Sequence, residues 1–210
     1  MSILSSKNFR LLANPLNMEN PVTVQILGIC SALAVTVKLK PAIVMGISVI
    51  VVTAFSNLVI SALRNYIPPR IRIIVQLVVV ASMVILVDQF LRAFVFDVSK
   101  QLSVYVGLII TNCIIMGRLE AYAMANDPWP SFLDGVGNGM GYAIILMIVG
   151  FIRELFGSGS ILGFKVIPQA FYDGGYINNG MMIMPTMALV LVGVIIWIQR
   201  SFNKELIEKD

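Results

Sequence analysis

The residues of this chain best suited to chemistry are its two cysteines, Cys30 and Cys113, each in a charge-free apolar stretch. A lone apolar cysteine is most often a small packing residue, and a disulfide is a second alternative that nothing in the sequence requires. A pair of thiols permits a third interpretation, because thiolates bind soft metal ions. An iron–sulfur cluster is usually held by four cysteines. A metal site here would therefore need two more ligands from a partner or a second copy.

Two aspartates are the other candidates. Asp88 lies one helical turn before Arg92 in "ILVDQFLRAF", which is compatible with an interfacial ion pair or with a cation pathway. Asp134, in "PSFLDGVGNGMG", is expected to cap a helix that starts behind it, with a cation pathway as the alternative. The chain contains no histidine, which excludes imidazole-ligated haem and imidazole-based metal sites or proton relays.

These residues must be positioned by membrane-spanning helices. The chain has 210 residues, of which 58% are hydrophobic and 12% charged, and its mean hydropathy is +0.90, values typical of an integral membrane protein. Charge-free runs long enough to cross the bilayer predict six spans, and only the third contains a charged residue, Asp88. The predicted spans are residues 20–37, 41–63, 73–91, 101–117, 135–152 and 180–199.

Six spans with short connections predict an all-α, single membrane domain over residues 1–210, in which each backbone group is satisfied within its helix. This organisation excludes catalysis by a soluble head. The net charge of +4 comes from basic residues near span ends, so it indicates anchoring in the membrane rather than binding to nucleic acid. Their distribution favours both termini in the cytoplasm.

The two halves of the chain resemble each other weakly. Each half, about 20–97 and about 101–200, has a span with a cysteine followed by a span that ends in an arginine, Arg64 or Arg153. Three spans per half predict two inverted-topology repeats. The first and fourth spans would then run antiparallel and bring both cysteines to similar depth. We expect the two arginines to snorkel to the interface.

Both cysteine-bearing spans are interrupted by small or polar residues. Gly28 and Ser31 flank Cys30, and Thr111 and Asn112 precede Cys113. Such residues predict broken helices that are buried in protein or line a site, and the N-termini of half-helices favour negative charge.

The fifth predicted span begins with alternating glycines at small-xxx-small spacing, which predicts close helix packing. These are Gly135, Gly137, Gly139 and Gly141.

The segments "LGICSALAVT", "SKQLSVYVGLIITNCIIMGRLEA" and "SFLDGVGNGMGY" resemble the NqrDE/RnfAE family, membrane subunits of the bacterial Na+-translocating NADH:quinone oxidoreductase (Nqr) and of the related Rnf electron-transport complex. The resemblance covers nearly the whole chain. Two features are more similar to the Nqr members of the family than to the Rnf members. They are the serine and alanine after Cys30 and the segment "SKQLSVYVG" that precedes the second cysteine.

The resemblance implies a multi-pass component of an inner-membrane translocase, NADH:ubiquinone reductase, that is inactive by itself. It implies a paralogous partner, NqrE, and assembly with NqrA, NqrB, NqrC and NqrF. Each paralogue would contribute two cysteines, here Cys30 and Cys113, to a [2Fe-2S] centre, with mononuclear iron as the alternative.

In the family, this centre relays electrons from NqrF, which binds NADH and FAD, to the covalent FMN of NqrC. Flavins in NqrB, including riboflavin, then pass them to ubiquinone, and the transfer is coupled to Na+ export. The resemblance also marks Asp88 and Asp134 as candidates for sodium uptake. An Rnf-type protein and a cofactor-free secondary transporter or scaffold with inverted repeats are the alternatives.

Overall fold

A computed structural model describes residues 11–16, 19–94, 107–162, 164–165 and 180–202. Regular structure in these residues is helical apart from one short antiparallel hairpin. Its strands are β1 (Ser160–Ile161) and β2 (Phe164–Lys165), with Ser160 opposite Lys165. The predicted all-helical class is therefore confirmed.

Within the described residues, four helices are long and apolar enough to cross a membrane, namely α3 (Leu39–Leu63), α4 (Arg72–Phe94), α7 (Pro128–Ser158) and α9 (Pro185–Phe202). They correspond to the second, third, fifth and sixth predicted spans. The start of α7 differs from the predicted start at residue 135. Asp127 is extended and Pro128 opens the helix, because proline is well suited to a first turn in which its missing N–H has no helical partner.

The other two predicted spans contain only short helices in the described residues. The helix α2 (Ile29–Val35) follows a stretch of turns. In the fourth span, helical geometry stops after residue 110 and resumes at α6 (Cys113–Arg118), which continues into the π-helical turn η2 (Leu119–Ala123). Residues 101–106 of that span lie outside the described residues. The predicted interruptions next to both cysteines are thus present, whereas two further full-length helices are not found in the described ranges.

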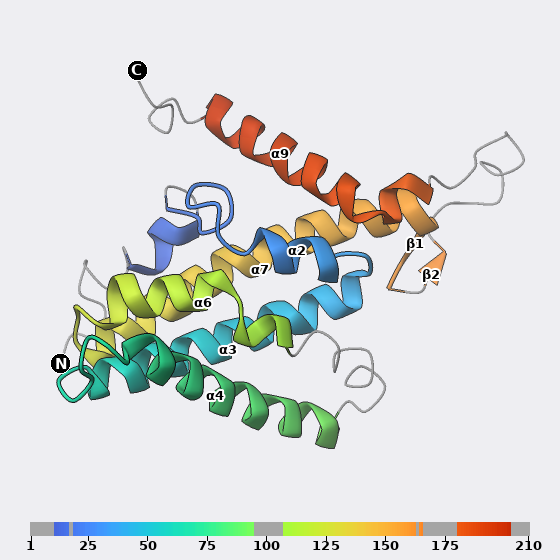
Figure 1. Cartoon of the computed structure of the whole chain (residues 1–210). Helices are drawn as coiled ribbons and strands as arrows, with labels where there is room; N and C mark the ends of the chain where they lie inside the picture. Colours follow the sequence, from blue (N-terminus) through green and yellow to red (C-terminus); the bar gives the residue numbers. More distant parts are fainter. Residues whose placement is uncertain (1–10, 17–18, 95–106, 163, 166–179, 203–210) are drawn as a thin grey trace, which may run out of the picture.

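The helices α3 and α7 form the centre of the molecule (Figure 1). A Cβ atom added to Gly135 would lie 2.8 Å from the Cα of Ala54, and one added to Gly139 would lie 2.8 Å from the Cα of Ile50. Contact positions that rise along α7 fall along α3, so the two helices are antiparallel. The predicted close approach at the glycines is confirmed, because only the absence of a side chain permits this separation.

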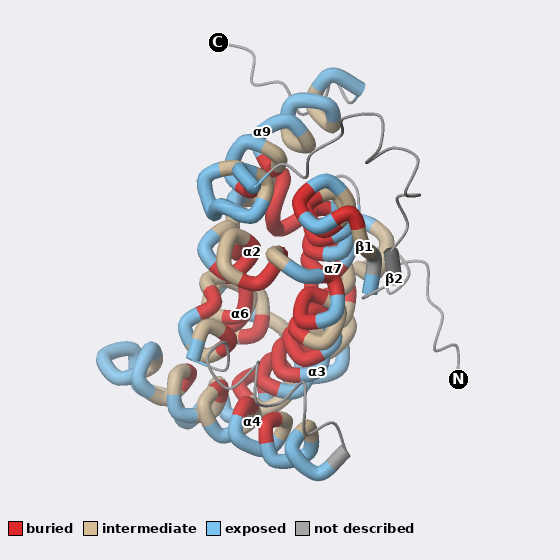
Figure 2. Tube along the Cα trace, turned by 90° about the vertical axis from the view of Figure 1, so that its right-hand side faces the viewer, coloured by how far each residue is buried: buried red, intermediate tan, exposed pale blue. Residues whose placement is uncertain are grey.

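The outer helices lie on opposite sides of this centre. The helix α4 packs on α3, while α9 contacts α2, α7 and the 3-10 turn η3 (Gly180–Ile183). Figure 2 shows that α4 and α9 are largely exposed, whereas buried residues concentrate on α3 and α7. Their exposed apolar surfaces are suited to contact with lipid or other membrane proteins.

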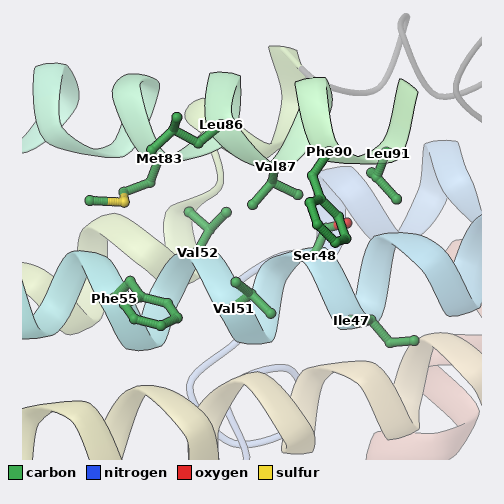
Figure 3. A pocket seen from close by; sticks show the side chains of 10 residues that line it. All are labelled: Ile47, Ser48, Val51, Val52, Phe55, Met83, Leu86, Val87, Phe90 and Leu91. Carbon is green, nitrogen blue, oxygen red and sulfur yellow. The ribbon is translucent and has the colours of Figure 1, made fainter. Parts of the chain in front are cut away.

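An apolar groove of about 500 Å³ lies between α3 and α4 (Figure 3). Phe55 of α3 and Met83 and Phe90 of α4 contribute to its walls. Neither cysteine lines it, so it is separate from the candidate metal centre.

Candidate metal centre

The short helices α2 and α6 begin side by side and carry the two cysteines in their first turns. Cys30 follows Ile29, the first residue of α2, and Cys113 is the first residue of α6. The backbone N–H of Gly28 donates a hydrogen bond of 2.8 Å to the Cys113 Sγ. From this point α2 and α6 extend in opposite directions (Figure 1). The structure thus brings together two segments separated by 85 positions along the chain.

The local sequence explains why both helices start here. Gly28 has φ 79° and ψ 9°, a left-handed conformation that favours glycine, and a Cβ atom at this position would lie 2.5 Å from the Ile114 Cδ1. Asn112 is extended and its side-chain oxygen accepts the N–H of Ile114 at 3.2 Å, which is the usual arrangement of an N-cap.

A buried polar network supports the two helix starts. The Ser31 hydroxyl donates to the carbonyl of Gly28 at 2.9 Å and lies 2.7 Å from the Tyr142 hydroxyl. The Asn112 amide donates to the Ser31 Oγ at 3.2 Å. Because buried polar groups are normally hydrogen-bonded, this network ties α2 and α6 to α7. Sequence reasoning identified Ser31 and Asn112 as helix-breaking residues but missed Tyr142, whose partner lies 111 positions away.

The two thiols are free and line one pocket of about 100 Å³. Cys30 is exposed and Cys113 is partly buried. The described residues contain no group of three or more His, Cys, Asp or Glu side chains that could hold a metal ion. Two thiols and a backbone N–H directed at one sulfur do fit half of a four-thiolate site, in which hydrogen bonds to sulfur are a usual feature. The site can be completed only by ligands from outside the described part of the chain.

Asp134 does not cap a helix, so that expectation is wrong. It lies inside α7, where its carboxylate is 3% exposed and accepts two hydrogen bonds from Arg118, at 2.9 Å from Nε and 2.5 Å from a terminal nitrogen. Asn138 also donates to this carboxylate at 3.1 Å. Arg118 is the last residue of α6, so this bidentate pair joins the end of α6 to α7. No sequence spacing indicated it, because the two residues belong to different helices.

Asp88 pairs with Arg92 on the same face of α4, with 2.9 Å between the carboxylate and Nε. Its side chain is 12% exposed and that of Arg92 is 54% exposed. The geometry matches the ion-pair alternative, and a place on a cation pathway stays a prediction. Asp88 is not among the residues that line the cysteine pocket.

The two arginines at the ends of α3 and α7 differ. Arg64 is partly exposed and pairs with the exposed Asp127 at 2.8 Å. Arg153 is only 1% exposed, so the expectation that it snorkels is wrong. Carbonyl groups of Leu33 and Met182 and the hydroxyl of Thr36 surround its guanidinium. These acceptors replace water, which removes the reason for the side chain to reach the interface.

Comparison with known proteins gives consistent similarities. The family described as "Rnf-Nqr subunit, membrane protein" matches residues 8–196. The chain is 58% identical over 198 residues, 94% of both chains, to a protein of Psychromonas ingrahamii that is named as the D subunit of "Na(+)-translocating NADH-quinone reductase". Proteins of the same name from Shewanella sp. (strain W3-18-1) and Shewanella halifaxensis are 54% and 55% identical, each over 95% of both chains.

Proposed function

Because the chain belongs to the Rnf-Nqr family of membrane subunits, we propose that it is the D-type component of a Na+-translocating NADH:quinone oxidoreductase and holds half of an intramembrane iron–sulfur centre. The assignment to this complex rests on relatives of that name that match the chain over almost its whole length. The metal assignment rests on one observation, the hydrogen bond from Gly28 to the Cys113 sulfur where two interrupted helices begin.

In this proposal Cys30 and Cys113 supply two thiolates, and a paralogous protein of the NqrE type supplies two more. The N–H of Gly28 stabilises negative charge on the Cys113 sulfur, because hydrogen bonds to ionised groups are stronger than those between neutral groups. The network of Ser31, Asn112 and Tyr142 fixes the position of the start of α2 relative to the start of α6. When bound, the centre would accept and donate single electrons between flavoproteins on the two sides of the membrane, and this transfer is coupled to Na+ export.

The same proposal gives the chain six membrane spans in one domain, with inverted halves over about 20–97 and about 101–200 and with both termini in the cytoplasm. Two packing relations support it. The corresponding helices α3 and α7 are antiparallel, and the corresponding helices α2 and α6 extend in opposite directions from their adjacent starts (Figure 1). An inverted repeat relates such pairs by an axis in the membrane plane.

The metal assignment is tested by iron analysis and electron paramagnetic resonance (EPR) of the purified complex. The double variant Cys30→Ala/Cys113→Ala is expected to lose the iron and the EPR signal of this centre while the flavin content is retained. The physical reason is that two of four thiolates are absent. Unchanged iron and an unchanged signal in the double variant would overturn the metal assignment and favour a scaffold or transporter.

A role of Asp88 in sodium uptake predicts a change in sodium dependence. Asp88→Ala is expected to raise the Na+ concentration for half-maximal turnover by about fivefold, the loss of about 1 kcal/mol in binding free energy. The measurement is steady-state turnover of the purified complex against Na+ concentration.

The matched control is Arg92→Gln, which breaks the same ion pair but leaves the carboxylate in place. We expect it to change the half-saturating concentration by less than about twofold. Equal effects of the two variants, or no effect of Asp88→Ala, would assign Asp88 to the ion pair alone.

A further inference from the structure

We propose that Arg153 is a positioning residue for Cys30, because it fixes the end of the short helix that carries this thiol. The proposal rests on the proposed function, since it concerns the same metal centre. It gives a role to a charged side chain that is buried within an apolar protein, lies outside the cysteine pocket and forms no ion pair within the described part of the chain.

One side of the guanidinium contacts the carboxyl end of α2. A terminal nitrogen of Arg153 lies 2.6 Å from the Thr36 Oγ1 and 3.3 Å from the Leu33 carbonyl oxygen. The Thr36 hydroxyl in turn donates to the carbonyl of Ala32 at 2.6 Å. The last carbonyl groups of a helix have no partner within it. Arg153 therefore gives the Leu33 carbonyl a partner and holds the Thr36 hydroxyl, whose bond to the Ala32 carbonyl adds to the backbone bond that Ala32 already accepts from the Thr36 N–H.

The other side of the guanidinium contacts the segment before α9. The Nε of Arg153 donates to the carbonyl of Met182 at 3.0 Å, and the second terminal nitrogen donates to the carbonyl of Ile183 at 2.8 Å and to that of Met184 at 3.3 Å. One charged group thus joins α7, α2 and the entry to α9. A buried charge is costly unless it is hydrogen-bonded. The acceptors on α2 and those before α9 are therefore held in place by the same guanidinium.

The next residue, Glu154, fixes the neighbouring helix end. Its carboxylate, in a residue only 7% exposed, accepts the N–H of Leu39 at 2.5 Å, and Leu39 is the first residue of α3. Two successive side chains of α7 therefore hold the corner between α2 and α3. The cation contacts the Leu33 carbonyl and the Thr36 hydroxyl at the end of α2, and the carboxylate contacts an amide at the start of α3, each matching the polarity of that helix end.

The length of α2 connects this corner to the thiol. A helix of seven residues is about 10 Å long, so a displacement of its last turn moves its first turn as well. The first turn carries Cys30, and Ser31 beside it belongs to the network with Tyr142. Arg153 and this network hold the two ends of α2, and together they determine where Cys30 lies relative to Cys113.

The test compares Arg153→Gln and Thr36→Val with the matched control Arg64→Gln in the purified complex. Arg64 lies at the end of α3, and Arg153 lies near the end of α7. Unlike Arg153, Arg64 is partly exposed and pairs with Asp127. Hydrogen exchange of the amides of residues 29–36 is measured together with the EPR line shape and midpoint potential of the metal centre. Losing a hydrogen bond to a charged group predicts exchange about tenfold faster in α2.

We expect Arg153→Gln and Thr36→Val to speed exchange in α2 and to shift the potential or line shape, and Arg64→Gln to do neither. Thr36→Val leaves the charge of Arg153 in place, so it tests the contact even if Arg153→Gln prevents assembly. Faster exchange only at residues 182–184, or faster exchange in α2 with unchanged EPR parameters, would overturn the positioning role. Failure of the metal assignment is a separate result, because iron would then survive removal of Cys30 and Cys113.

Discussion

Replacing either Cys30 or Cys113 by alanine is expected to lower NADH-to-quinone turnover of the assembled complex by at least about a hundredfold. Loss of a residue that only supports a metal ligand already costs about 10–100-fold in metal affinity or activity, and these variants remove a ligand itself. Both thiols line one pocket, and in the proposed centre each supplies a separate ligand, so neither replaces the other. Steady-state turnover with NADH and a water-soluble quinone measures the effect.

The control for this prediction is the reaction that precedes the proposed centre. In the proposed electron path NADH is oxidised at a flavoprotein before electrons reach this centre, so both cysteine variants are expected to retain reduction of an artificial acceptor by NADH within about twofold while quinone reduction is lost. A matching loss of both reactions would point to failed assembly. Quinone reduction within about twofold of the wild type in either variant would contradict an electron relay through Cys30 and Cys113.

The second large effect is expected at the buried pair of Asp134 and Arg118. Asp134→Ala leaves the guanidinium of Arg118, whose side chain is 14% exposed, without its carboxylate. Breaking a buried pair on one side costs about 3–5 kcal/mol, because the remaining charge is unpaired. We expect a lower melting temperature of the complex and less assembled complex in the membrane, measured by thermal denaturation and by the yield of intact complex.

A double substitution separates this role from sodium binding. Adding Arg118→Gln to Asp134→Ala removes the stranded charge, so it is expected to restore part of the lost stability. The exposed pair of Arg64 and Asp127 provides the control, and Asp127→Ala is expected to change stability by less than about 1 kcal/mol. A different result would place Asp134 on a cation pathway instead. In that case Asp134→Ala leaves stability unchanged but raises the Na+ concentration that turnover requires, and adding Arg118→Gln does not lower this concentration again.

The sequence supported correct predictions wherever a local signal was sufficient. The long apolar runs predicted α3, α4, α7 and α9, and polar residues beside each cysteine predicted that these two helices are interrupted. The glycines at the start of the fifth span predicted close packing, which occurs against Ala54 and Ile50. These signals are local because hydrophobicity, helix breaking and side-chain volume act on the segment that contains them.

Predictions for charged side chains were less successful. Asp134 was expected to cap a helix, but Pro128 starts α7 earlier and places it opposite Arg118. Arg153 was expected at the interface, but it is buried among carbonyl groups. The cost of burying a charge depends on the partners available, and these partners come from other helices. The sequence order of the residues does not reveal them.

The amino-acid sequence alone establishes a helical membrane protein with two thiols beside breaks in apolar segments. The meeting of the starts of α2 and α6, with Gly28 donating to the sulfur of Cys113, follows only from the folded arrangement of the helices. The same is true of the side chains that hold these short helices in place, Tyr142, Arg118 and Arg153. The physical reason is that apolar patterning acts over a few turns of helix, whereas a hydrogen bond acts over about 3 Å. The N–H of Gly28 and the sulfur of Cys113 are 85 positions apart in the chain, and only the fold brings them within that distance.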